Sequence, residues 1–354
     1  MNTDVEHHIV EQVKNAAAEQ TSLKIIGGHS KSFYGRIPQG EVLNLSQHSG
    51  IVSYEPTELV ITARAGTTIR EIQKLLAENN QMLGFEPTLC NDDSTLGGVV
   101  AAGLAGPARA YTGSVRDFIL GVRMINGNAE VLNFGGQVMK NVAGFDHSRL
   151  MAGSLGTLGV LLEISLRVLP APKYVTTVRI QHADPDEAIT FMNQLSGKPY
   201  PVSAAAWFAG STRIRLSGTQ EGVNSAIKHI GNDSHDQSDE FFSQLNAHQL
   251  DFFNKPDVLY RLSVPATCRN FCENEDQLID WGGAQRWIVD INDIASFKVR
   301  VKSKGANLTI FRGGDRQAEV FDELDSVSMK LHQNIKLAFD PKRILNPGRM
   351  YKDL

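Results

Sequence analysis

A short apolar run that stops at two glycines constrains the fold of this chain more than any other feature. Leu23–Ile26 is typical of a strand, and Gly27 and Gly28 end it at a turn followed by small hydroxyl side chains. Glycines let consecutive backbone N–H groups converge on an anion, and Lys31 adds a positive charge nearby. The segment predicts a phosphate-binding loop, although such a turn alone is more often only a tight turn.

A second glycine motif, residues 153–160, enters a strand instead of opening a helix. Nucleotide-binding Rossmann folds place their glycines at the start of a helix, so this motif argues against that fold. The chain also lacks Gly-x-Gly-x-x-Gly and the Gly-Lys-Ser/Thr of phosphate loops. NAD binding and ATP hydrolysis therefore lose their usual support in the sequence.

The spacing of apolar residues in the first half predicts small strands mixed with helices. A helix is expected at residues 4–20 and another from Thr68, where Thr68 and Glu71 suit a capping box. Strands are expected at 23–26, 42–45, 51–54, 59–64, 117–125, 129–134 and 159–169. A Pro-Ala-Pro sequence at 170–172 then predicts a domain boundary.

The second half follows a different order, which matches a β-α-β-β-α-β ferredoxin-like unit. Its expected elements are a strand at 174–182, a helix at 185–195, strands at 202–208 and 212–216, a helix at 220–230 and a last strand at 258–264. A helical insertion at 238–250 is expected before that last strand, and a long helix at 317–337 after it. The chain is therefore assigned to the α+β class.

Length and charge exclude several other classes of protein. A chain of 354 residues is about right for two domains. The net charge of −4 gives no reason to expect a nucleic-acid partner. Charged residues interrupt the N-terminal apolar stretch, so neither a signal peptide nor a membrane span is expected, and the chain should start near Met1 and work in the cytoplasm.

The three cysteines are too few for a disulfide framework or a four-thiolate iron–sulfur cluster. Cys268 and Cys272 are spaced for one helical face and could share a metal with a histidine, but plain thiols, like Cys90, are the preferred interpretation. No metal site is predicted.

Two further motifs, residues 93–98 and 113–117, lie between the two glycine motifs, and the segment 95–106 is built almost wholly of small residues. In this order the four motifs resemble the vanillyl-alcohol-oxidase, or PCMH-type, family of FAD proteins. The resemblance implies that the first loop cradles the pyrophosphate, that the middle segments line flavin and ribose, and that the last motif receives the adenine end. By motif position, the implied cofactor-binding residues are Gly27, Gly28, His29, Ser30, Lys31, Ser32, Phe33, Pro87, Ser94, Thr95, Leu96, Gly97, Gly98, Gly103, Ser114, Arg116, Asp117, Gly153, Ser154, Gly156, Thr157, Gly159 and Val160.

The same resemblance implies a division of the chain into domains. A PCMH-type FAD-binding domain of two small α/β subdomains is expected at 1–170, and a ferredoxin-like cap domain at 171–310. A C-terminal helix and tail at 311–354, closing with Asn346-Pro347-Gly348-Arg349, are expected to return to the FAD domain.

The resemblance narrows in residues 138–150, 280–287, 54–64, 103–107 and the closing Asn-Pro-Gly-Arg-Met-Tyr. These segments are similar to the E subunits of bacterial glycolate oxidase. That family implies a complex with a D-type flavoprotein subunit and an iron–sulfur F-type subunit, which together oxidise glycolate to glyoxylate. It implies a cytoplasmic protein, with a place at the inner face of the cytoplasmic membrane through its partners as an option.

The chain departs from the catalytic D-type dehydrogenases of the wider family in one respect. It has neither Gly-Asp-Gly-Asn-x-His nor Gly-Glu-His-Gly, which carry histidines in those enzymes. The histidines of the second half share no motif and are more often surface or core-edge residues than bases; they are His182, His229, His235, His248 and His332. No catalytic residue is assigned, and we expect a subunit that assists a catalytic partner or relays its electrons. A flavin-free scaffold and a free-standing 2-hydroxyacid oxidoreductase are the alternatives.

Several roles stay open at this point. FAD is expected to be non-covalent, with His29 as the residue through which a covalent link would form. Arg116-Asp117 suits either a flavin-facing pair or an ion pair that caps a strand, and the structural role is favoured. The aromatic segment around Trp281 and Trp287 suits a lid or docking surface, with core packing as the default, and the role of Lys140-Asn141 is undecided.

Overall fold

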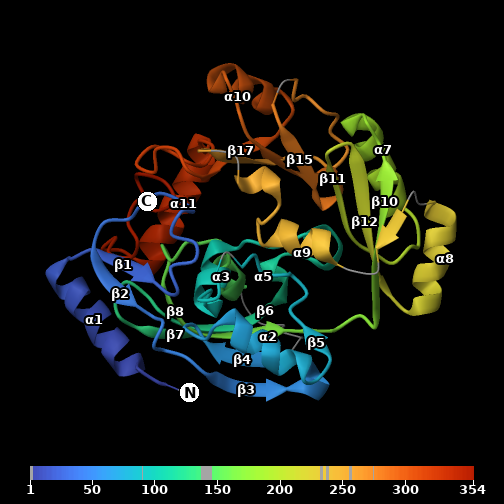
Figure 1. Ribbon diagram of the computed structural model, residues 1–354. Coiled ribbons are helices and arrows are strands. Elements are labelled where there is room, and N and C mark those ends of the chain that lie inside the picture. The colour runs from blue at the N-terminus through green and yellow to red at the C-terminus, as the bar shows by residue number, and fades with distance from the viewer. Residues whose placement is uncertain are drawn as a thin grey trace. The chain divides into compact units, whose positions relative to one another are not determined.

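The computed structural model describes residues 3–89, 91–136, 146–231, 234–236, 239–254, 257–273 and 275–354. The chain divides into two compact units. Unit 1 contains residues 1–105, 114–171 and 315–354, and unit 2 contains residues 106–113 and 172–314. Helices and strands occur in both units, as Figure 1 shows, so the predicted α+β class is confirmed.

Unit 1 is built on a five-stranded antiparallel sheet in the order β3-β4-β8-β6-β7. Its strands are β3 (Ile51–Glu55), β4 (Val60–Arg64), β8 (Val160–Arg167), β6 (Ile119–Ile125) and β7 (Val131–Gly135). Apolar residues of this sheet pack against the buried sides of α2 (Ile69–Ala77) and α3 (Leu96–Ala102). Thr68 caps α2 by accepting the backbone N–H of Glu71 at 3.2 Å, which is half of the expected capping box.

A smaller layer of unit 1 contains the first glycine motif. Strands β1 (Leu23–Ile26) and β2 (Glu41–Asn44) pair in parallel, and α1 (Glu6–Glu19) packs its buried residues with theirs, beside them in Figure 1. This second core also includes Val160 and Leu162 of β8, so β8 is buried on both faces. The remaining short elements of unit 1 are η1 (Pro56–Glu58), β5 (Gln81–Met82), α5 (Val115–Phe118), α6 (His147–Leu150) and β9 (Leu169–Pro170).

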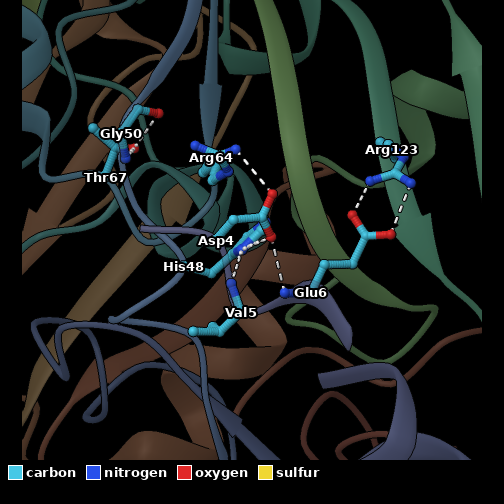
Figure 2. Close-up of polar contacts among 8 residues, drawn as sticks. All are labelled: Asp4, Val5, Glu6, His48, Gly50, Arg64, Thr67 and Arg123. Atoms are coloured by element: carbon cyan, nitrogen blue, oxygen red, sulfur yellow. Dashed lines mark hydrogen bonds and ion pairs between the residues drawn. The ribbon is translucent and has the colours of Figure 1, made fainter. Parts of the chain in front are cut away.

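Polar contacts fasten the segment before α1 to the main sheet (Figure 2). The carboxylate of Asp4 accepts a hydrogen bond from Arg64 at 2.9 Å and lies 3.6 Å from the Nδ1 atom of His48. Glu6 forms a two-pronged ion pair with Arg123 of β6. His48 is completely buried, so this cluster joins a buried histidine to carboxylates near the start of the chain.

The long C-terminal helix begins later than expected. Helix α11 covers Ser326–Phe339 because Asp325 caps it by accepting the backbone N–H groups of Val327 and Ser328, each at 2.9 Å. The predicted start at residue 317 is therefore wrong. Lys336 of this helix is buried and contacts Asp340 at 2.7 Å.

Unit 2 contains an eight-stranded sheet in the order β13-β10-β12-β11-β15-β16-β14-β17. Helices α7 (Pro185–Ser196) and α8 (Gln220–Ile230) pack on β10, β11 and β12, as Figure 1 shows, while α10 (Ile294–Ser303) packs near β17. The strands are β10 (Tyr174–Gln181), β11 (Val202–Phe208), β12 (Ser211–Gly218), β13 (Ser234–Asp236), β14 (Leu259–Ser263), β15 (Gln277–Asp280), β16 (Gln285–Ile288) and β17 (Asn307–Arg312).

The ferredoxin-like motif closes with a different strand from the expected one. Strand β13 pairs antiparallel with β10, with Thr177 opposite Asp236, and completes the β-α-β-β-α-β order. The predicted last strand exists as β14, but it pairs with β16 and β17 instead. The insertion helix α9 (Glu240–Asn246) and the turn η2 (Asp251–Asn254) therefore follow the motif.

Candidate functional site

A cavity of about 260 Å³ lies in unit 1 where the first glycine motif meets α3 and the C-terminal tail. The described residues of its lining include three cationic side chains, those of Lys24, Lys31 and Arg349, and no carboxylate. The predicted residues that line it are Gly27, Gly28, His29, Ser30, Lys31, Ser32, Thr95, Gly97, Gly98, Gly156 and Gly159. The structure thus brings three of the four motifs together around one positively charged cavity.

The first wall is the loop that follows β1, and its glycines are required by close packing. A Cβ atom on Gly27 would lie 2.3 Å from the Oγ1 atom of Thr95, and one on Gly28 would lie 1.5 Å from the carbonyl oxygen of Asp93. Both distances are below any real contact, so a side chain at either position would push the loop away from α3.

The backbone of this loop has donors to spare. Among the described residues, no protein acceptor receives the N–H groups of the four consecutive residues Gly27, Gly28, His29 and Ser30. Backbone N–H groups rarely remain unpaired in a folded protein unless water or a ligand accepts them. Successive N–H groups beside a cavity without carboxylates form a suitable receptor for a phosphate.

The second wall is the start of α3, where small residues keep the surface open. Thr95 caps the helix by accepting the N–H of Gly98 at 3.3 Å. A Cβ on Gly97 would lie 2.8 Å from the Cβ atom of Ala65, which also lines the cavity. Ala101 and Ala102 continue the same wall, so a flat ligand can approach the helix backbone closely.

The third wall is the turn before β8. The N–H of Leu155 donates to the carbonyl of Ala101 at 2.8 Å, which attaches the turn to α3. Gly156 has a φ of +71°, and a Cβ there would lie 2.7 Å from the Nδ2 atom of Asn346. This turn is therefore packed between α3 and the C-terminal tail.

The tail completes the cavity with two residues that no motif assigned to the site. Asn346 accepts a hydrogen bond from the backbone N–H of Ile25 and donates one to the carbonyl of Leu155, both at 2.8 Å. Arg349 donates to the carbonyl of Tyr34 at 3.2 Å. The sequence signal was the Asn-Pro-Gly-Arg turn, whose expected return to the first domain gave no role to either residue.

The other residues that sequence analysis missed are mostly apolar. They are Lys24, Ile25, Ile26, Tyr34, Ile37, Pro38, Leu45, Ala65, Ala101, Ala102, Leu155 and Leu161. Most of them lie in or beside a motif that was recognised, and they complete the lining where the three walls come together.

The remaining predicted residues do not line the cavity. Leu96 and Val160 belong to hydrophobic cores, and the Oγ atom of Ser94 donates to the carbonyl of Asn91 at 3.0 Å. Gly153, Ser154 and Thr157 line a second cavity of about 190 Å³ beside α11. Gly103 lies where its Cβ would be 2.8 Å from the Cα atom of Gly153. Phe33 and Pro87 are also absent from the lining.

Ser114, Arg116 and Asp117 form a local cap at the start of α5. The carboxylate of Asp117 accepts the backbone N–H of Ser114 at 2.9 Å, and these two residues make a reciprocal capping box. This backbone hydrogen bond and the Ser114 hydroxyl overcome partial burial and hold the pKa of Asp117 below its usual range. Arg116 lies 3.8 Å from Asp117 in an exposed ion pair, and Asp117 caps a helix where the sequence suggested a strand.

The described histidine side chains of the second half contact neighbouring residues and lie away from the cavity. His182 contacts the Oγ1 atom of Thr212 at 2.8 Å, while His229 and His332 each contact a backbone carbonyl one helical turn earlier at 2.8 Å. His248 stacks on Phe253 with ring centroids 4.4 Å apart. None of them lines the 260 Å³ cavity. The side chain of His235 lies outside the described residues.

Trp281 anchors a distant segment of unit 2. Its ring N–H donates to the carbonyl of Gly106 at 3.0 Å, and Arg109 of the short helix α4 (Arg109–Thr112) lies 4.4 Å above its ring. Gly282 in the turn η3 (Trp281–Gly283) has a φ of +64° beside Tyr111. Trp287 is buried and packs against Phe311. Both tryptophans therefore make packing contacts within unit 2.

The described part of the chain contains no group of three or more His, Cys, Asp or Glu side chains placed to hold a metal ion. Cys268 and Cys272 are free thiols, and burial raises the pKa of Cys272 to about 12. The sequence Lys140-Asn141 and Cys90 lie outside the described residues.

Comparison with known proteins identifies two sequence families in the chain. Residues 4–135 match the family described as FAD binding domain, and residues 312–350 match the C-terminal domain of FAD linked oxidases. The second match covers the tail that carries Asn346 and Arg349.

Two curated relatives align over most of the chain. Glycolate oxidase subunit GlcE of Escherichia coli (strain K12) is 42% identical over 351 residues, which cover 99% of both chains. D-lactate dehydrogenase of Anaerostipes hadrus is 24% identical over 88% of this chain and 80% of its own length. Glycolate oxidase subunit GlcD of Bacillus subtilis (strain 168) is 26% identical over 46% of this chain and 35% of its own.

A solved structure of alkyldihydroxyacetonephosphate synthase shares the fold. Its TM-score is 0.70, and the alignment covers 98% of this chain and 76% of that one at 14% sequence identity. The expected PCMH-type fold is thereby confirmed.

Proposed function

Because this chain belongs to the family of glycolate oxidase E subunits, we propose that it is the FAD-binding subunit of a complex that oxidises glycolate to glyoxylate. The chain is an FAD-dependent oxidoreductase subunit, and its cofactor is FAD. The observation that carries the proposal is the row of four backbone N–H groups without a described protein acceptor, beside a cavity lined by cations.

The residues present fit a dinucleotide. The loop 27–30 offers N–H donors suited to a pyrophosphate, and the glycines and alanines of α3 leave room for a flat ring system. We assign cofactor binding to the eleven predicted residues that line the cavity, together with Asn346 and Arg349. Among the other motif residues, Ser114 and Asp117 cap α5, while Leu96 and Val160 pack in the cores.

FAD bound in this site would supply a two-electron acceptor for the hydride that glycolate loses with a proton when it becomes glyoxylate. The chain's own contribution is to bind and orient that cofactor. A base within reach of the hydroxyl and a cation for the carboxylate are also needed. This chain has neither histidine motif of the catalytic relatives, so we assign substrate oxidation to a D-type partner.

The complex is multi-subunit and contains a D-type flavoprotein, as the similarity to both GlcE and GlcD indicates. We add to the proposal an iron–sulfur F-type subunit that accepts electrons, and a cap domain at residues 171–310. In the described part of the chain no helix has the length and apolar character needed to cross a bilayer. Contact with the inner face of the cytoplasmic membrane is accordingly proposed to run through the partners.

The experiment is to express the chain alone and together with its partners, and to measure flavin content and glycolate-driven flavin reduction in both. The proposal expects FAD in the chain alone but glycolate oxidation only with the D-type subunit. A correctly folded chain that takes up no FAD would favour the scaffold alternative. Substrate-dependent bleaching without partners would favour the free-standing oxidoreductase.

The linkage to FAD is proposed to be non-covalent. His29 has a φ of +55° and an exposed side chain, and its Nδ1 atom lies 3.5 Å from the hydroxyl of Ser32. Acid precipitation should therefore release all of the yellow colour into the supernatant. Flavin that stays in the pellet after washing would instead establish a covalent link, which His29→Ala should abolish.

A further inference from the structure

Arg349 occupies an unusual electrostatic position at the edge of the cavity. Among the described residues, its guanidinium donates only to two backbone carbonyls, that of Tyr34 at 3.2 Å and that of Lys31 at 3.5 Å, and pairs with no carboxylate. Burial, reinforced by the positive charge of Arg316, lowers the pKa of Arg349 to about 10. The side chain remains charged at neutral pH, and no described side chain acts as its counter-ion.

The carbonyl contacts use only one of the guanidinium nitrogens, Nη2. A guanidinium has five N–H donors in a planar fork that matches phosphate oxygens. The contacted carbonyls belong to the same loop whose preceding residues, 27–30, carry the spare backbone N–H groups. The free donors of Arg349 and these N–H groups therefore border one cavity that has no carboxylate in its lining.

We propose that Arg349 is the counter-ion of the cofactor's pyrophosphate, so that the C-terminal tail supplies a charged ligand to the phosphate loop. The inference rests on the proposed binding of FAD to this cavity. It gives the tail a role in binding beyond closing the fold, and it makes FAD affinity depend on a residue more than 300 positions from the glycine loop.

Arg36, which lies between β1 and β2, provides a matched control because it contacts the same tail. Its Nε atom donates to the carbonyl of Gly348 at 2.9 Å, and its Nη1 atom lies 3.6 Å from the carboxylate of Glu319. Arg36 is buried, with 8% of its surface exposed, and it does not line the cavity. Replacing Arg36 should remove contacts that hold the C-terminal tail, but it should leave the positive charges that line the cavity unchanged.

The test titrates the flavin-free full chain with FAD at low and high salt, for the wild type and for Arg349→Gln, Arg349→Lys and Arg36→Gln. Thermal unfolding checks that each variant is folded. Arg349→Gln is expected to weaken FAD binding roughly 10- to 100-fold, the range for a lost hydrogen bond between charged groups. It should also flatten the dependence of affinity on salt, because a screened charge pair has been removed.

Arg349→Lys should recover part of the affinity and the salt dependence, while Arg36→Gln should retain the wild-type salt dependence. If Arg349→Gln does not fold, the Lys variant carries the comparison, since it keeps the charge but loses the fork. FAD affinity within about twofold of wild type in the Gln variant, or an unchanged salt dependence in it, would overturn the inference. If only the Lys variant folds, an FAD affinity that no longer depends on salt in that variant would overturn the inference. A wild-type chain that binds no FAD would overturn the proposed function itself.

Discussion

The side-chain oxygen of Asn346 accepts a hydrogen bond from the backbone N–H of Ile25 at 2.8 Å, so the C-terminal tail holds the strand that leads into the glycine loop. The amide nitrogen of the same side chain donates to the carbonyl of Leu155, also at 2.8 Å. Asn346 is 2% exposed, and both of its partners line the cavity. One buried amide thus joins two walls of the site that are about 130 residues apart in sequence.

Replacing Asn346 by alanine should both destabilise unit 1 and weaken FAD binding. The change leaves a buried N–H and a buried carbonyl without partners, each at a cost of about 1–3 kcal/mol. Its φ of +42° adds strain for alanine, whereas Asn346→Gly removes the hydrogen bonds without that strain. Urea unfolding should show a large decrease in the free energy of unfolding for both variants. A glycine variant as stable as wild type would mean that the hydrogen bonds contribute little.

The glycine loop could be predicted from sequence because two glycines directly after a short apolar run mark the end of a strand. The reason that Gly27 and Gly28 are required could not, because it lies in their packing against Thr95 and Asp93. The roles of Asn346 and Arg349 could not, because they arise when the tail returns to β1, and the sequence pattern near residue 346 shows only a turn. Strand β13 was missed for a similar reason. Three residues give no periodicity, and pairing with β10 alone makes them a strand.

The start of α11 shows how a cap can outweigh spacing. The predicted helix at 317–337 included Val320 and Phe321. Asp325 instead accepts two backbone N–H groups and begins the helix at Ser326, while Val320 is buried outside it. An N-cap residue such as Asp325 inside a predicted helix can therefore mark the true start of that helix.

Gly28→Ala should abolish tight FAD binding. Its Cβ would lie 1.5 Å from the carbonyl oxygen of Asp93, so the loop must move, at a cost of about 1–3 kcal/mol or more. Gly136→Ala is the control, because no atom of the described residues lies within 4 Å of a Cβ at that position. FAD titration by fluorescence quenching measures both. Equal affinity for the two variants would show that the loop does not form the binding surface.

Lys336→Met should strongly destabilise the chain. The ammonium group of Lys336 donates to Asp340 at 2.7 Å and to the carbonyls of Thr157 and Leu345, and both charged side chains are buried. Removing one partner leaves an uncompensated buried carboxylate, which costs about 3–5 kcal/mol. The double variant with Asp340→Asn should recover part of that loss in urea unfolding. A single variant within about 1 kcal/mol of wild type would contradict a stabilising role for the pair.

The buried His48 should make stability fall at mildly acidic pH. Burial lowers the pKa of His48, against the opposing effect of the Asp4 carboxylate, while Arg64 and Arg123 lower it and Glu6 raises it. The folded state therefore binds the proton less readily than the unfolded state, whose histidine titrates near pH 6.5. The stability that neutral His48 provides is complete above that pH and is lost as the pH falls.

The expected slope below pH 6.5 reaches at most about 1.4 kcal/mol per pH unit from this one group. Urea unfolding of wild type and His48→Gln between pH 7.5 and pH 5, roughly the range in which histidine titrates, measures the difference. The variant should show the shallower decline. Parallel curves would show that burial does not disfavour protonation of His48, which Figure 2 draws beside Asp4.

The central claim is that this chain binds FAD yet leaves glycolate oxidation to a partner. The most direct measurement is the visible absorption spectrum of the purified chain, recorded before and after glycolate is added, without and then with the D-type subunit. We predict a flavin spectrum in the chain alone that glycolate leaves unchanged, and glycolate-dependent reduction only after the partner is present. Bleaching of the isolated chain by glycolate, or a folded chain with no flavin even after incubation with FAD, would contradict the account.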